Sequence, residues 1–136
     1  MIPTLAALTG FVTWTLLLLV VMESMRTKLV LTRVIPANGF TPDNANLSPF
    51  MQRLARAHAN CLEGLPVFGG LMVIAVVADR PSVTDPLAYV LLAARVAQSA
   101  IHLCSVSPTA VTLRFTAFSV QMAIAAYWAL RLLRVA

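Results

Sequence analysis

The sequence predicts an all-α integral membrane protein, a four-helix antiparallel bundle that forms a single domain over residues 1–136. Its composition is the first reason, because 60% of the residues are hydrophobic and only 11% are charged, against about 25% in a soluble domain. The mean hydropathy is +0.85. The second reason is that four apolar segments are each long enough to cross a hydrocarbon core of ~30 Å.

Proline marks the expected helix starts. It is tolerated in the first turn of a helix, and a serine or aspartate before it accepts hydrogen bonds from free backbone N–H groups. The last three segments share this pattern, at Ser48-Pro49, Asp85-Pro86 and Ser107-Pro108. The predicted helices cover residues 3–33, 49–78, 86–104 and 108–134, with a loop between the first two.

Charge and cysteine usage argue against two other kinds of protein. The net charge of +5 comes from basic residues scattered among apolar segments, so it does not indicate a nucleic-acid partner. Cys61 and Cys104 lie inside or beside apolar segments and are not part of any zinc-type spacing. We therefore expect both cysteines to be packing residues and expect no metal site.

Lysine and arginine in short loops predict the orientation, because these residues favour the cytoplasmic side. The connection between the second and third helices carries only Arg80, and the C-terminal end of the fourth helix carries Arg131 and Arg134, which argue for the opposite orientation but are fewer. The region connecting the first two helices carries more: Arg26, Lys28, Arg33, Arg53 and Arg56. This connection should be cytoplasmic and both termini external.

Two polar stripes run along otherwise apolar helices. Arg56, Asn60 and Glu63 stand at i, i+4 and i+7, which is one face of the second helix. The third helix has a similar stripe, made of Arg95, Gln98, Ser99 and His102. Polar residues inside a membrane are costly and usually mark a site.

The two stripes are expected to form one polar column that is open toward the cytoplasm. Counting residues from each helix start places Glu63 and Arg95 at a similar depth, so we predict that they form an ion pair at the closed end. The same count places Asn60 level with Gln98 and Ser99. Arg114 and Arg26 should enter the column from its open side. The pair could serve only to fix helix register, but several cations around one carboxylate suit an anionic ligand that carries carboxylates.

The residues of the second helix resemble a family signature. The stretch from Arg56 to Glu63, Arg-Ala-His-Ala-Asn-Cys-Leu-Glu, is followed by Pro66-Val-Phe68. This resembles the MAPEG family, the membrane-associated proteins in eicosanoid and glutathione metabolism, which include microsomal glutathione transferases. Arg95-Val-Ala and Leu113-Arg114 resemble the third and fourth helices of that family.

The resemblance implies a homotrimer that binds glutathione, or a related thiol, between subunits near the cytoplasmic side. Arg114 matches the arginine that stabilises the glutathione thiolate. Gln98 and His102 stand where relatives often carry tyrosine, and Phe118 also replaces a tyrosine. His102 is expected to be a second donor. The positions implied to contact glutathione are Arg26, Arg56, Asn60, Glu63, Arg95 and Gln98.

The function that the resemblance implies is a glutathione-dependent transferase or peroxidase, acting on a lipophilic co-substrate that arrives through the membrane lipid. Two alternatives remain open. The missing tyrosines favour a binding or scaffold protein that keeps the fold without the chemistry. The polar column would also suit a small transporter subunit. Thiol-dependent turnover distinguishes the first alternative from the enzyme, and flux into liposomes tests the second.

The predicted orientation can be tested by labelling. A single cysteine in place of Gly39 should resist a membrane-impermeant thiol reagent applied to intact cells, because the surrounding loop is expected to face the cytoplasm. The same cysteine should react once the cells are permeabilised. Efficient labelling of intact cells would contradict the orientation.

Overall fold

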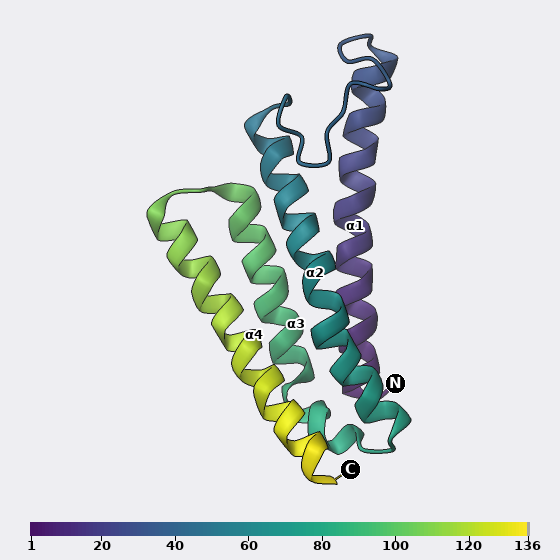
Figure 1. The fold of residues 1–136 in the computed structure, drawn as a ribbon, viewed down its shortest axis with the longest axis vertical. Helices are drawn as coiled ribbons and strands as arrows, with labels where there is room; N and C mark the ends of the chain where they lie inside the picture. Colours follow the sequence, from purple (N-terminus) through teal and green to yellow (C-terminus); the bar gives the residue numbers. More distant parts are fainter. Residues whose placement is uncertain (136) are drawn as a thin grey trace.

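The computed structural model describes residues 1–135 and contains four helices in that range, α1 (Pro3–Leu31), α2 (Pro49–Val77), α3 (Pro81–Cys104) and α4 (Pro108–Val135). They form an antiparallel bundle with both chain termini at one end and the long α1–α2 connection at the other (Figure 1). Each helix is long and apolar enough to cross a membrane. The predicted all-α, four-helix membrane fold is confirmed.

Every helix begins at a proline. A proline in the first turn costs no hydrogen bond, since the first backbone N–H groups of a helix have no partner within it. The Ser48 hydroxyl accepts a hydrogen bond from the backbone N–H of Met51 over 3.3 Å. The Ser107 hydroxyl accepts one from Ala110 over 3.2 Å. Serine caps therefore start α2 and α4 as the sequence predicts.

The start of α3 differs from the prediction. The helix begins at Pro81 and not at Pro86, which lies inside it. Asp85 does not cap α3, because its carboxylate accepts a hydrogen bond from the backbone N–H of Thr4 over 3.0 Å. The prediction was wrong because the chain offers two prolines that could start the helix, and the carboxylate beside the second is used by α1.

Two helices end slightly earlier than predicted. α1 was expected to reach residue 33 but ends at Leu31, and Arg33 adopts a φ of 58°. α2 was expected to reach residue 78 but ends at Val77, and Asp79 adopts a φ of 57°. A residue in this left-handed region reverses the chain direction, so it stops the helix that precedes it.

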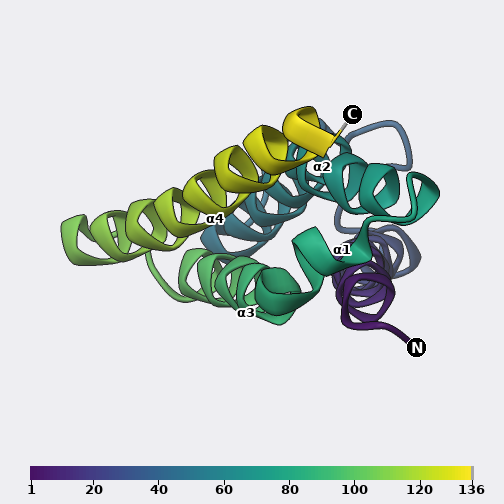
Figure 2. The same ribbon diagram turned by 90° about the horizontal axis from the view of Figure 1, so that it is seen from below.

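α3 is the central element of the bundle and contacts all three other helices. α4 packs mainly on α3, and its first half diverges from α2 (Figures 1 and 2). The buried core takes large side chains from every helix: Phe11, Leu54, Met72, Leu91 and Trp128. Since α4 has little contact with α2, the bundle is loosest between these two helices.

The two ends of the bundle are tied by polar contacts. At the end with the termini, the Thr4 hydroxyl lies 2.6 Å from the hydroxyl of Thr84, and Asp85 accepts from both the backbone and the hydroxyl of Thr4. These groups join the first turn of α1 to α3. Buried polar groups that satisfy one another in this way fix the register of the two helices.

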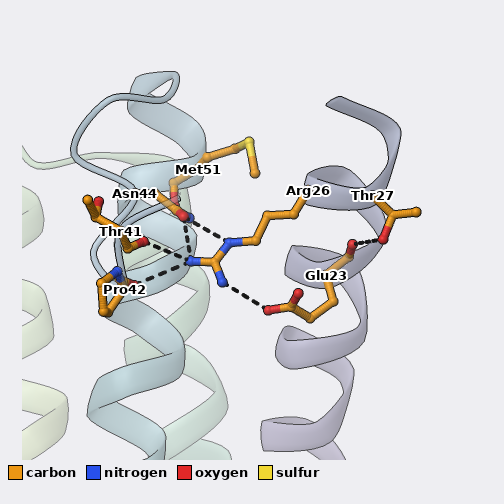
Figure 3. A network of polar contacts seen from close by, with 7 residues as sticks. All are labelled: Glu23, Arg26, Thr27, Thr41, Pro42, Asn44 and Met51. Atoms are coloured by element: carbon orange, nitrogen blue, oxygen red, sulfur yellow. Dashed lines mark hydrogen bonds and ion pairs between the residues drawn. The ribbon is translucent and has the colours of Figure 1, made fainter. Parts of the chain in front are cut away.

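At the opposite end, Arg26 clamps the α1–α2 connection (Figure 3). Its Nε and Nη2 atoms donate to Oδ1 of Asn44 over 3.0 and 2.6 Å, and Nη2 also donates to the Thr41 carbonyl over 3.1 Å. Its Nη1 pairs with Glu23 at 3.0 Å. Asn44 in turn donates to the Met51 carbonyl over 2.8 Å. One guanidinium thus joins α1, the loop and the start of α2.

The loop also has internal order. The carboxylate of Asp43 accepts hydrogen bonds from the Thr41 hydroxyl over 2.8 Å and from the Ala45 backbone over 3.1 Å. The Thr41 hydrogen bond is the main reason that the pKa of Asp43 lies below its ordinary value. Because the pKa of this carboxyl group is lowered in the folded protein, its hydrogen bonds stabilise the fold at pH values above the ordinary pKa. This stabilisation is lost as the pH falls through the lowered pKa.

The clamp predicts a stability effect at Asn44, which is fully buried and has a φ of 55°. Asn44→Ala should destabilise the protein by about 2 kcal/mol. The substitution removes hydrogen bonds to a charged group, and alanine tolerates a positive φ less well than asparagine does. Asn44→Gly tolerates that φ and should lose less. Thermal unfolding in detergent measures both, with the exposed Asn38→Ala as control. An unchanged unfolding temperature for Asn44→Ala would mean that the clamp contributes nothing.

Candidate functional site

A cleft of about 630 Å³ opens between α2, α3 and α4. Its polar wall is formed by Asn60, Glu63, Arg95 and Gln98. Its apolar wall is formed by Val67, Phe68, Phe118, Met122 and Ala125. A few polar groups on a mainly apolar wall are typical of small-molecule sites. The cleft brings four of the predicted site residues together.

Arg95 is the most unusual group in this cleft. Its side chain is only 1% exposed, yet Nε and Nη2 have no hydrogen-bond partner among residues 1–135. The guanidinium carbon lies 5.4 Å from the ring centre of Phe11 and 5.6 Å from that of Phe68. Aromatic faces attract a cation, and more strongly when water is excluded. Two rings therefore hold the guanidinium in place without neutralising its charge.

The predicted ion pair between Glu63 and Arg95 is not formed. In the described part of the chain, the ion pair that forms is the one between Arg26 and Glu23. Glu63 lies on the exposed surface of α2 at the cleft, whereas Arg95 is enclosed by the two phenylalanines. The prediction was wrong because depth along a helix does not determine the direction in which a side chain points.

A glycine makes room for the guanidinium. A Cβ at Gly64 would lie 2.8 Å from Nη2 of Arg95 and 3.1 Å from the ring of Phe68. Any larger residue at this position would displace the arginine. The absence of a side chain at Gly64 is thus part of what keeps Arg95 between its two rings.

The polar residues of α2 and α3 meet in a different register from the one predicted. Asn60 was expected level with Gln98 and Ser99, but its Nδ2 lies 3.5 Å from Nδ1 of the buried His102. The Ser99 hydroxyl lies instead 3.1 Å from the sulfur of Cys61. Asn60 nevertheless connects the cleft to His102, so these two predicted site residues are in contact.

Arg114 lies next to the cleft and not on its wall. It lines a smaller hollow of about 210 Å³ together with Gln98 and Phe118, both of which also line the main cleft. Its Nε is buried and has no hydrogen-bond partner among the described residues. A second arginine with an unused donor, Arg114, therefore lies beside the main cleft.

Two other predicted arginines lie outside the cleft wall. Arg56 is exposed on α2. Arg26 uses its donors on Glu23, Asn44 and Thr41 in the loop clamp. Sequence reasoning could identify both as cations near one membrane face, but it could not foresee that the loop would engage one of them.

Several residues of the site could not be recognised from sequence patterns. Phe11 comes from α1, far along the chain from Phe68, and no spacing connects the two. Gln121 is fully buried and donates to Gln98 over 2.8 Å. Its place two turns after Arg114 on one face of α4 is the only pattern that pointed to it.

The comparison with known families settles the class of this fold. A family model described as the MAPEG family matches residues 3–134. The chain belongs to the MAPEG family. The resemblance predicted from the second helix is therefore confirmed, and this MAPEG protein is a multi-pass membrane protein of that family. No curated protein and no solved structure matches the chain.

The role of Gly64 can be tested against a glycine in the same helix. Gly70 has open space where a Cβ would be added. Gly64→Ala and Gly70→Ala gain the same helix propensity, so any difference between them reports the displacement of Arg95 and Phe68. We expect Gly64→Ala to be less stable than Gly70→Ala by about 1 kcal/mol or more in thermal unfolding. Equal stabilities would show that Arg95 moves aside without loss.

Proposed function

We propose that the protein is a membrane-bound, glutathione-dependent transferase or peroxidase that acts on a lipophilic co-substrate. The observation that carries this proposal is the buried guanidinium of Arg95, a residue that lines an apolar cleft in a MAPEG protein and has two donors without a partner among the described residues. An unpaired charge at this depth is costly. A ligand carboxylate would supply the missing partner.

The groups around the cleft fit the groups of glutathione, which carries two carboxylates, an ammonium and a thiol. Arg95 and Arg56 would bind carboxylates through their planar donor forks. Glu63 is the carboxylate on the cleft wall and would accept hydrogen bonds from the ammonium. Asn60 and Gln98 would supply neutral hydrogen bonds.

The reaction requires an ionised thiol, because the thiolate is the nucleophile. Lowering a thiol pKa by one unit requires about 1.4 kcal/mol of preferential stabilisation of the anion. The guanidinium of Arg114, with a buried and unused Nε, would provide it in a partly desolvated hollow. His102, which contacts Asn60, would serve as a second donor.

Conjugation and peroxide reduction share their first step in this proposal. In conjugation, the thiolate sulfur attacks an electrophilic carbon and the leaving group departs with the electron pair of the broken bond. In peroxide reduction, the sulfur attacks a peroxide oxygen, the electron pair of the O–O bond leaves with the other oxygen, which takes a proton, and a second glutathione reduces the resulting sulfenic acid to give the disulfide and water. The co-substrate would enter from the lipid along Val67, Phe118, Met122 and Ala125, which form the apolar wall.

The assembly and orientation belong to the same proposal. A homotrimer would allow Arg56, which is exposed and lies off the cleft wall of its own chain, to complete a site shared between subunits. Arg26 would support that site from the loop clamp. The positive charge around the α1–α2 connection favours a site that faces the cytoplasm.

A scaffold protein without chemistry is the second candidate. Phe118 favours it, since this residue lines both the cleft and the Arg114 hollow and has no hydroxyl to offer a thiolate. Glutathione-dependent turnover of a lipophilic electrophile or hydroperoxide by the purified protein tests the choice. Tight glutathione binding with no bound thiolate at neutral pH would favour the scaffold.

Two arginine variants separate binding from thiol activation. Arg114→Ala should leave glutathione affinity within a few-fold but raise the apparent thiol pKa by about one unit or more. Arg56→Ala should weaken binding by about tenfold, because a hydrogen bond between charged groups contributes about 1.5 kcal/mol. Titration calorimetry gives the affinities, and the ultraviolet absorbance of the thiolate, followed against pH, gives the pKa.

The pattern of effects decides the roles. If Arg114→Ala has the same titration midpoint as the parent protein, Arg114 does not activate the thiol. If Arg56→Ala binds glutathione as tightly as the parent, Arg56 holds no carboxylate. Arg131→Ala, on the exposed end of α4, is the matched control and should change neither quantity.

A further inference from the structure

A pair of glutamines lies between α3 and α4 beside the cleft. Gln121 of α4 has 0% of its surface exposed and Gln98 of α3 has 8%. The Nε2 atom of Gln121 donates a hydrogen bond to Oε1 of Gln98 over 2.8 Å. Buried amides are costly compared with apolar side chains of similar size. The pair therefore destabilises the fold relative to two apolar side chains, which suggests that the orientation of one amide has a role in the site.

The backbone of α4 fixes which way the Gln121 amide faces. Its Nε2 also donates to the carbonyl oxygen of Ala117, one turn earlier, over 3.1 Å. A carbonyl oxygen can only accept, so the atom of Gln121 that faces it must be the amide nitrogen. The same nitrogen then faces Gln98 and requires an acceptor there. The orientation of Gln98 thus follows from a main-chain oxygen of α4.

The other arm of the Gln98 amide is left for the site. Gln98 lines both the main cleft and the hollow that holds Arg114. Because its Oε1 is occupied by Gln121, its two amide N–H donors remain available there. We propose that Gln121 is a positioning residue, which turns the amide of Gln98 so that it donates a hydrogen bond to the sulfur of the bound thiolate. This inference rests on the proposed function.

Gln121 acts only through Gln98 in this arrangement, since it is fully buried and is not on the cleft wall. Its own Oε1 is buried and has no partner among the described residues. This destabilising feature is explained if the amide of Gln121 is needed to orient Gln98. The charged and titratable groups around this point are Glu63 on α2, Arg95 and His102 on α3, and Arg114 on α4. A neutral amide adds a donor to that set without adding charge.

A double-mutant comparison tests the role. The measured quantity is the pH midpoint of the thiolate absorbance of bound glutathione, with the affinity determined separately. Gln98→Met, Gln121→Met and the double variant should each raise the midpoint by the same amount, about one pH unit, because all three remove one donor from the sulfur. Gln52→Met, at the start of α2, is the control and should match the parent. A Gln121→Met midpoint equal to the parent's, or a shift that adds to that of Gln98→Met, would overturn the role.

Nuclear magnetic resonance gives a second readout that does not depend on the absorbance. The chain has three glutamines, Gln52, Gln98 and Gln121, so selective side-chain labelling yields few amide signals. Glutathione should shift the Gln98 signal and leave that of Gln52 in place. In Gln121→Met, the Gln98 signal should no longer respond in the same way. An unchanged response would contradict the positioning role.

The outcomes also separate this inference from the proposed function. If the parent protein binds glutathione as a thiolate and Gln121→Met behaves like the parent, the positioning role is wrong and the function stands. If the parent forms no bound thiolate, the proposed function fails and the positioning role fails with it. Thermal unfolding of each variant shows that the comparison is made between folded proteins.

Discussion

The constraint on which most of this structure depends is a guanidinium group buried in an apolar bundle. A charge moved out of water costs several kcal/mol unless it is paired. Arg95 has no carboxylate partner in the described chain. Two phenylalanine rings and a glycine that leaves space surround its guanidinium, and the residue lines the cleft. The rings of α1 and α2 and the arginine of α3 therefore form one unit, which commits three helices to a fixed mutual position.

The polar contacts at the two ends of the bundle complement this unit. Thr4 and Asp85 tie α1 to α3 near the termini, and Arg26 with Asn44 ties α1 to the start of α2 through the loop. The looser contact lies between α2 and α4, where the cleft opens. α4 is held by its packing on α3, to which it contributes the buried Trp128, and it supplies one wall of the cleft.

The sequence predicted the fold well because apolar length and proline-marked helix starts act locally. It failed at α3, where two prolines were available and the carboxylate of Asp85 was used by a distant helix. For the site, helical periodicity correctly grouped Asn60 with Glu63, because residues on one helix face stay together. Periodicity could not show whether Glu63 and Arg95 form an ion pair. Their side chains lie on different helices, and packing sets how far each helix is rotated about its own axis. Nothing in the sequence indicated that Phe11 and Phe68 would enclose Arg95.

The replacement of tyrosine by amide and phenylalanine around the proposed thiol site has a physical consequence. A phenol hydroxyl can rotate to meet an anion, so it needs little support from its neighbours. A carboxamide has a donor arm and an acceptor arm, and the wrong arm would place an oxygen against a thiolate. An amide that serves an anion must therefore be held by a second group of fixed polarity. The hydrogen bonds from Gln121 to Ala117 and Gln98 supply that polarity from the helix backbone, which cannot reverse. A site without these tyrosines can in this way keep a directed donor beside Arg114.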